Sequence, residues 1–183
     1  NYLRAIELAS GEWCWLMGDD DPVDFGLISY LLLTIEKIKT EILLLIDEKD
    51  NINFDKYMPT LISGMSFFEP NHDVLGIQLQ KVGRVLCKTD PAHEILQHAY
   101  NVGVGDLHSY LHIYADLLLK TGISVTLVDL ILDTKPLSSL PRWNIIRGHT
   151  GAWKATVTAF SKYKIQAINR ERRIRSNLLL IAV

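Results

Sequence analysis

Five consecutive apolar residues, at positions 13–17, end at Gly18 and are followed by the adjacent aspartates Asp19, Asp20 and Asp21. A short unbroken apolar run bounded by glycine is typical of a strand buried on both faces, as in the interior of a parallel sheet. The pattern therefore predicts a strand with three carboxylates just beyond its carboxyl end. In open α/β sheets, ligands bind at that end of the strands.

The three aspartates allow two interpretations. Adjacent like charges repel one another unless water or a cation screens them, and hard cations such as Mg²⁺ or Mn²⁺ prefer carboxylate oxygens. The other interpretation is a solvated acidic turn that begins the next helix, and the aspartates taken alone favour it.

The flanking sequence changes this assessment. Residues 1–21 resemble the middle of bacterial family 2 glycosyltransferases with the GT-A fold, in which a helix ending in Ala-x-Gly leads into an aromatic-rich strand with an acidic DxD-type motif at its end. The Gly-Asp-Asp-Asp form is similar to the O-antigen and capsule sugar transferases, the abequosyltransferase-like group. The resemblance is specific over residues 1–24 and looser beyond them.

This resemblance implies an α/β protein, an incomplete GT-A (Rossmann-like) nucleotide-sugar-binding domain with a more helical acceptor and C-terminal region. It implies a metal-dependent transferase, inverting like most of the family, that moves a sugar from a nucleotide-sugar donor to a lipid-linked oligosaccharide or polysaccharide in cell-envelope glycan synthesis. Asp19 and Asp20 are expected to bind the donor, and Asp19 with Asp21 the Mn²⁺ or Mg²⁺ ion that bridges its diphosphate. Asp20 with Asp21 is an equally open metal pair. No nucleic-acid partner is expected.

The family also implies a carboxylate downstream that acts as general base on the acceptor hydroxyl, because the attacking alcohol must lose its proton. Asp106, on a Gly-rich turn before an amphipathic helix, is in the corresponding region, although the Glu-Asp pair common in the family is absent there. His108 is the competing base, since a neutral imidazole accepts a proton near pH 7. A plain helix N-cap is the structural alternative for Asp106.

Two other functions remain open. His108, His112 and Asp116 recur at i, i+4 and i+8 and would line one face of a helix, as in a helical His/Asp metal site. The glutamate that HExxH motifs place beside the first histidine is absent. The third interpretation is a non-catalytic α/β interaction module whose aspartates form a surface loop. Metal preference separates the three, because oxygen-rich sites prefer Mn²⁺ or Mg²⁺, His-rich sites prefer Zn²⁺, and the module needs no metal.

Hydrophobic periodicity predicts helices over residues 1–10, 25–39, 91–100 and 107–120, and strands over 41–46 and 123–132. The helix at 25–39 is expected to be buried against a sheet, and Asp90 is expected to be the N-cap of the third helix. Residues 73–88 fit strand and helix equally. Alternating helices and strands favour a parallel α/β sheet. We expect residues 1–65 to be the C-terminal part of the donor-binding half, 66–141 the acceptor-side half and 142–183 a basic helical tail.

Charge is unevenly distributed along the 183 residues. Residues 1–141 carry a net charge of −10 and residues 142–183 one of +8, which together give the overall −2. A cluster in the basic segment is expected to contact the anionic inner face of the cytoplasmic membrane, or equally to lie against the acidic part of the chain. The cluster consists of Arg170, Arg172, Arg173 and Arg175.

The remaining composition is that of a globular protein, with 48% hydrophobic and 22% charged residues. No apolar run is long enough to span a bilayer, and we expect a cytoplasmic protein. The only two cysteines, Cys14 and Cys87, are expected to be buried structural thiols in a reducing compartment. Because the first residues already fit a helix, we expect the chain to be an inactive fragment that lacks upstream strands.

Overall fold

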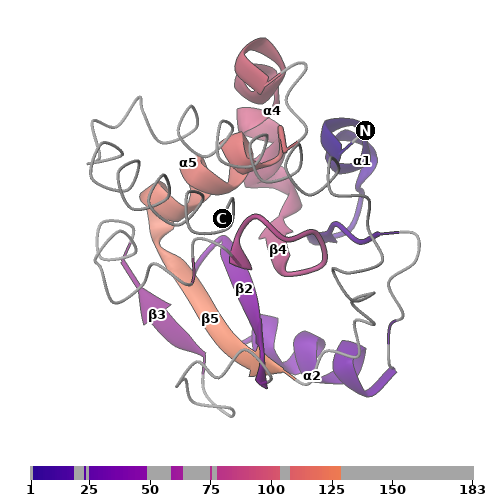
Figure 1. The fold of residues 1–183 in the computed structure, drawn as a ribbon, viewed down its shortest axis with the longest axis vertical. Coiled ribbons are helices and arrows are strands. Elements are labelled where there is room, and N and C mark those ends of the chain that lie inside the picture. The colour runs from indigo at the N-terminus through magenta and orange to yellow at the C-terminus, as the bar shows by residue number, and fades with distance from the viewer. Residues whose placement is uncertain are drawn as a thin grey trace, which may run out of the picture.

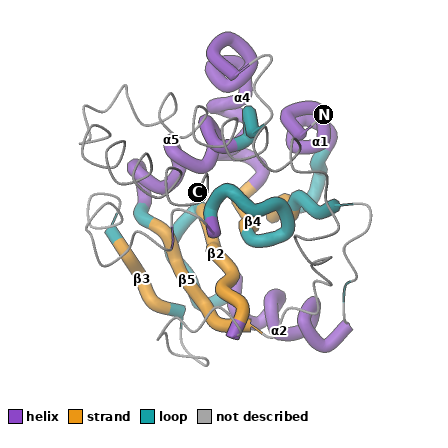
Figure 2. The backbone as a smooth tube through the Cα atoms, in the orientation of Figure 1, coloured by secondary structure: helices purple, strands orange, loops and turns teal. Residues whose placement is uncertain are grey.

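The computed structural model describes residues 2–18, 23, 25–48, 59–63, 75, 78–103 and 108–128. Four helices and five strands lie in these ranges, and the class is mixed α/β, as predicted (Figures 1 and 2). The helices are α1 (Tyr2–Leu8), α2 (Phe25–Ile35), α4 (Thr89–Gly103) and α5 (Leu111–Thr121). The strands are β1 (Trp13–Trp15), β2 (Ile42–Asp47), β3 (Thr60–Ile62), β4 (Val85–Lys88) and β5 (Ile123–Val128).

The described strands form one sheet in the order β1-β4-β2-β5-β3. β2 and β5 are parallel, whereas β4 is antiparallel to both β1 and β2, and β3 is antiparallel to β5. The sheet is therefore mixed, and the expectation of a purely parallel sheet is wrong. β1 and β2 still run in the same direction, because both oppose β4. Strands from residues 1–65 and from residues 66–141 belong to this same sheet.

Helices cover both faces of the central strand β2. Successive side chains of β2 point to opposite faces of the sheet. On one face, Ile42, Leu44 and Ile46 pack in an apolar cluster with residues of α1, α4 and α5. On the other face, Leu43 and Leu45 pack in a second cluster with residues of α2. Figure 1 shows α1, α4 and α5 gathered together and α2 apart from them. All six residues of β2 are buried. This burial on both faces explains the unbroken apolar sequence of the strand.

The prediction that residues 13–17 form a strand buried on both faces is wrong. Within the described residues β1 lies at the end of the sheet and pairs with β4 alone. Cys14 is buried, but Trp13 and Trp15 are only partly buried. A strand at the end of a sheet has a neighbouring strand on one side only, so the apolar run at 13–17 does not occupy the sheet interior. That position belongs to β2.

The expected burial of the helix at 25–39 is also corrected. α2 ends at Ile35 and buries only Leu31 and Thr34. Phe25 is 85% exposed, and Leu32 and Leu33 are each more than half exposed. A helix that packs on one sheet buries a single stripe of its surface, so apolar residues spread around the whole helix leave several in solvent.

Other element boundaries differ from the predictions by a few residues. The undecided residues 73–88 include β4 at their end. α4 begins at Thr89, so Asp90 lies in the first turn of the helix rather than at its N-cap. α5 begins at Leu111 instead of position 107, after a turn at 108–110. β2 and β5 are confirmed as strands, and the predicted extension of β5 past Val128 lies outside the described residues.

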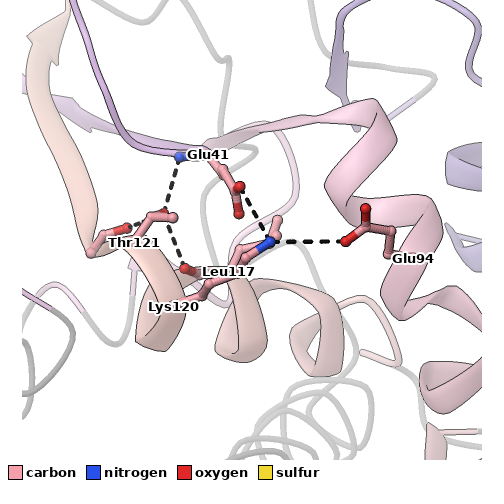
Figure 3. Close-up of polar contacts among 6 residues, drawn as sticks. Glu41, Glu94, Leu117, Lys120 and Thr121 are labelled. Atoms are coloured by element: carbon pink, nitrogen blue, oxygen red, sulfur yellow. Dashed lines mark hydrogen bonds and ion pairs between the residues drawn. The ribbon is translucent and has the colours of Figure 1, made fainter.

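Polar contacts fix the end of α5 against α4 and β2 (Figure 3). The Glu41 amide donates to Thr121 Oγ1 at 3.1 Å, and that hydroxyl lies 3.2 Å from the Leu117 carbonyl. Lys120 Nζ lies 3.4 Å from Glu41 and 3.9 Å from Glu94. These contacts hold the point at which the chain turns from α5 into β5.

Candidate functional site: the carboxyl edge of the sheet

Three strands end at one edge of the sheet. β1 and β2 both oppose β4, and β5 is parallel to β2, so the carboxyl ends of β1, β2 and β5 face the same way. We call this side the carboxyl edge. It carries residues 16–18 after β1, Asp47 at the end of β2, and the loop of residues 78–84 that leads into β4. Ligands of α/β sheets bind at such an edge.

The 78–84 loop is bonded to the ends of both neighbouring strands. The Gly83 amide donates to the Leu16 carbonyl at 2.9 Å, and the Trp15 indole Nε1 donates to the Gly83 carbonyl at 3.0 Å. On the other side, the Leu45 amide donates to the Arg84 carbonyl at 2.7 Å. Gly83 has a φ of 84°, a conformation that favours glycine. The backbone leading to Asp19 is thus held by a loop from elsewhere in the chain.

A buried ion pair also lies at this edge. Arg84 Nη2 is 3.6 Å from Asp47 Oδ2, and both side chains are almost completely buried. Asp47 is the last residue of β2, and Arg84 immediately precedes β4. Removing two charges from water is costly, and their mutual attraction offsets the cost only while both are present. The pair therefore links the ends of β2 and β4 electrostatically.

His108 is oriented at the same loop through Tyr110. Tyr110 Oη donates to the Gln80 carbonyl at 2.6 Å, because a carbonyl oxygen can only accept. His108 Nδ1 lies 2.8 Å from that Oη, whose single proton is already donated, so Nδ1 must be the donor. The neutral His108 ring then carries its proton on Nδ1, and the basic nitrogen is Nε2, which is buried. Burial raises the pKa of Tyr110, which keeps the phenol protonated.

Replacing Tyr110 by phenylalanine tests this tautomer assignment. We expect Tyr110→Phe to remove the preference for Nδ1–H on His108, and to lower the free energy of unfolding by about 1–3 kcal/mol because the buried hydrogen bonds of the Tyr110 hydroxyl to His108 and the Gln80 carbonyl are lost. Nitrogen NMR of the imidazole ring measures the first effect and urea unfolding the second. Tyr100→Phe is the control, since that hydroxyl bonds to Glu7 at the exposed surface. An unchanged His108 tautomer in Tyr110→Phe would show that another group orients the ring.

The alternative His/Asp metal site receives no support from the described residues. His112 lies on α5 and is buried against α4. A Cβ added at Gly103 of α4 would lie only 2.9 Å from the His112 ring. Its ring therefore packs closely against the Gly103 backbone. Among the residues that the structure describes, no three His, Cys, Asp or Glu side chains are grouped so that they could hold a metal ion.

The structure describes some of the predicted site residues and not others. Asp19, Asp20, Asp21 and Asp106 lie outside the described residues, as do the four tail arginines, so their roles remain predictions. His108 is described and partly buried. The Asp47–Arg84 pair and Tyr110 were not predicted. A carboxylate at the end of the all-apolar strand β2 signals that a buried partner is needed, but nothing local identifies Arg84.

No family model, curated protein or solved structure matched the chain in the three comparisons with known proteins. Within the described part of the chain, no helix has both the length and the apolar character required to cross a membrane. The fold and the carboxyl edge therefore define the class of the protein as mixed α/β, with the candidate site at the strand ends.

Proposed function

We propose that this protein is a glycosyltransferase of the family 2 type with a GT-A-like fold, acting on a nucleotide-sugar donor and a cell-envelope acceptor. The observation that carries the proposal is the convergence at the carboxyl edge. The acidic sequence Asp19–Asp21 directly follows residues 16–18 of this edge, and the 78–84 loop links Leu16 to the Tyr110–His108 pair. The segment that leads to the candidate donor residues, and a candidate base, are thus bonded to the same loop.

The donor set fits a hard divalent cation. Three carboxylates in sequence offer only oxygen ligands, which Mn²⁺ and Mg²⁺ prefer. Asp19 and Asp21 would hold the ion, with Asp20 and Asp21 as the other pair, and Asp19 and Asp20 would also face the donor. When bound, the ion would neutralise charge on the departing diphosphate.

Deprotonation of the acceptor is assigned to His108 or Asp106. The acceptor oxygen forms a bond to the anomeric carbon as the bond from that carbon to the diphosphate oxygen breaks, and the hydroxyl proton passes to the base. In the tautomer set by Tyr110, His108 Nε2 has the lone pair that this transfer requires, and this buried atom must become accessible before an acceptor can reach it. Asp106 is close in sequence and remains the alternative base. Contact of Arg170, Arg172, Arg173 and Arg175 with anionic lipid would bring a lipid-linked acceptor near the site.

The test is metal-dependent donor binding and turnover by the full-length protein that contains this sequence, with Asp19→Asn and Asp21→Asn. We expect Mn²⁺-dependent binding of nucleotide-sugars to the unmodified full-length protein, and a loss on the order of 100-fold in kcat/KM in the variants, because about 3 kcal/mol of charge stabilisation disappears. Glu12→Gln is the matched control, since Glu12 is an exposed carboxylate just before β1. Each variant should unfold at the same urea concentration as the unmodified protein.

The outcome also separates the alternative functions. Normal sugar transfer by both aspartate variants would contradict the transferase assignment of this motif. A folded protein that binds neither Mn²⁺ nor any nucleotide-sugar would instead favour the non-catalytic interaction module. Preference for Zn²⁺ with loss of binding in His112→Gln would favour the helical metal site.

A further inference from the structure

The two cysteines of the chain are direct neighbours in the sheet. Cys14 on β1 is the register partner of Cys87 on β4, and both thiols are free and buried. Both side chains belong to the same apolar cluster, so they lie on the same face of the sheet. They are 73 positions apart in the sequence, and the antiparallel pairing of β1 with β4 brings them together.

The strand register at this pair places the two cysteines close enough for a disulfide to be considered. The Thr89 amide donates to the Glu12 carbonyl at 2.9 Å, which marks Glu12 and Thr89 as a hydrogen-bonded pair of the ladder. Cys14 and Cys87, two positions along, are therefore a pair of the same type. Such partners have Cα atoms roughly 5.5 Å apart, within the range of about 4.4–6.8 Å found in disulfides. Their Cβ atoms are about 5.5 Å apart in such a pair, above the roughly 3.5–4.5 Å of disulfides, so the short strand β1 must shift locally, without a change of register, to join the two sulfur atoms.

The two thiols differ in pKa and in exposure, and these differences indicate which sulfur attacks first. The neighbouring Cys87 thiol lowers the pKa of Cys14, whereas the neighbouring Cys14 sulfur together with burial raises the pKa of Cys87. Cys14 also lies on a three-residue strand at the end of the sheet and retains 7% exposure, whereas Cys87 has none. Thiolate character and access both favour Cys14 as the attacking sulfur.

We propose that Cys14 and Cys87 form a reversible redox pair that is oxidised to a disulfide by a low-molecular-weight disulfide such as oxidised glutathione. The Cys14 thiolate attacks one sulfur of the reagent, whose S–S bond breaks and releases one thiolate, leaving a mixed disulfide on Cys14. Cys87 then gives up its proton and attacks the Cys14 sulfur, which expels the second thiol. In total, two protein thiols are oxidised, one reagent disulfide is reduced to two thiols, and both protons go to those thiols.

The disulfide would link β1 covalently to β4. It would close a long loop that includes α2, β2 and β3, and such closure restricts the unfolded chain. We therefore expect the oxidised protein to unfold at a higher temperature than the reduced one. The same link would restrain the strand that leads to Asp19. This inference does not depend on the proposed transferase activity.

The test is exposure of the folded protein to oxidised glutathione. We expect the intact mass to fall by two hydrogen atoms, both thiols to become unreactive toward a thiol reagent in denaturant, and peptide mapping to join the peptides of Cys14 and Cys87. Dithiothreitol should reverse all three changes. An unmodified protein with two reactive thiols after prolonged exposure, or disulfides only between separate molecules, would overturn the proposal.

Two single variants test the assigned roles. Cys87→Ser should stop at the mixed disulfide, with one glutathione on Cys14, whereas Cys14→Ser should leave Cys87 reduced. The reverse pattern would overturn the assignment of Cys14 as the attacking sulfur. Cys14→Ala and Cys87→Ala repeat the experiment without a buried hydroxyl, and circular dichroism establishes that each variant is folded before exposure.

Discussion

Gly122→Ala should lower the free energy of unfolding by about 3 kcal/mol or more, through two independent effects. Gly122 joins α5 to β5 with a φ of 77°, a conformation that L side chains rarely adopt. A Cβ at this position would also lie 2.6 Å from the carbonyl oxygen of Ile62 on β3, closer than real contacts allow. Relief of the overlap requires β3 to move away from β5, which breaks their pairing.

Urea unfolding followed by circular dichroism measures this effect. Gly11→Ala is the matched control, because a Cβ there would meet only the Trp13 carbonyl at an ordinary distance of 3.5 Å. The control should unfold at the urea concentration of the unmodified protein or slightly above it, since alanine restricts the unfolded chain. Equal unfolding midpoints for Gly122→Ala and the unmodified protein would contradict the close approach of β3 to this turn.

Arg84→Met should destabilise the protein by about 3–5 kcal/mol, because it breaks the buried ion pair of Arg84 with the Asp47 carboxylate. The Arg84–Asp47 pair is long, at 3.6 Å, while the Arg4–Glu7 pair on α1 is short, at 2.7 Å. Distance alone would rank the second pair as stronger. Burial decides otherwise, since Arg4 and Glu7 are exposed and water screens them.

Arg4→Met is therefore the control, and we expect its unfolding midpoint to stay close to that of the unmodified protein. The double variant Arg84→Met with Asp47→Leu should recover much of the stability lost by Arg84→Met, because no isolated charge remains in the interior. Additive losses in the double variant would mean that the two side chains act independently, and the ion pair at the carboxyl edge would then have no energetic role.

Local pattern was sufficient to predict several elements. The apolar residues of β2 and β5, and the amphipathic spacing of α4 and α5, predict a strand or helix at close to the observed positions. These signals depend on residues a few positions apart, which face the same side of one element. The mixed α/β class also follows from the order of these elements along the chain.

Strand order and the contacts at the candidate site were not predictable in this way. Insertion of β4 between β1 and β2 moves the apolar run at 13–17 to the end of the sheet, and residues 73–88 carry no periodicity that signals it. The link from His108 through Tyr110 to Gln80 depends on the same insertion. Charge patterning likewise indicated acidic residues at a strand end, but could not identify Arg84 as the partner of Asp47.

The sequence by itself determined most of the helices and strands, though not β3 or β4, and it placed Asp19–Asp21 a few residues after the strand β1. Only the tertiary structure decided which strands are neighbours. It therefore decided that Cys14 pairs with Cys87, and that the Ile62 carbonyl lies too close to Gly122 to allow a side chain there. The physical reason is the sequence separation over which each kind of interaction acts. Helical and strand periodicity arises from neighbours along the chain, whereas pairing between strands is set by burial and hydrogen bonding among residues far apart in sequence.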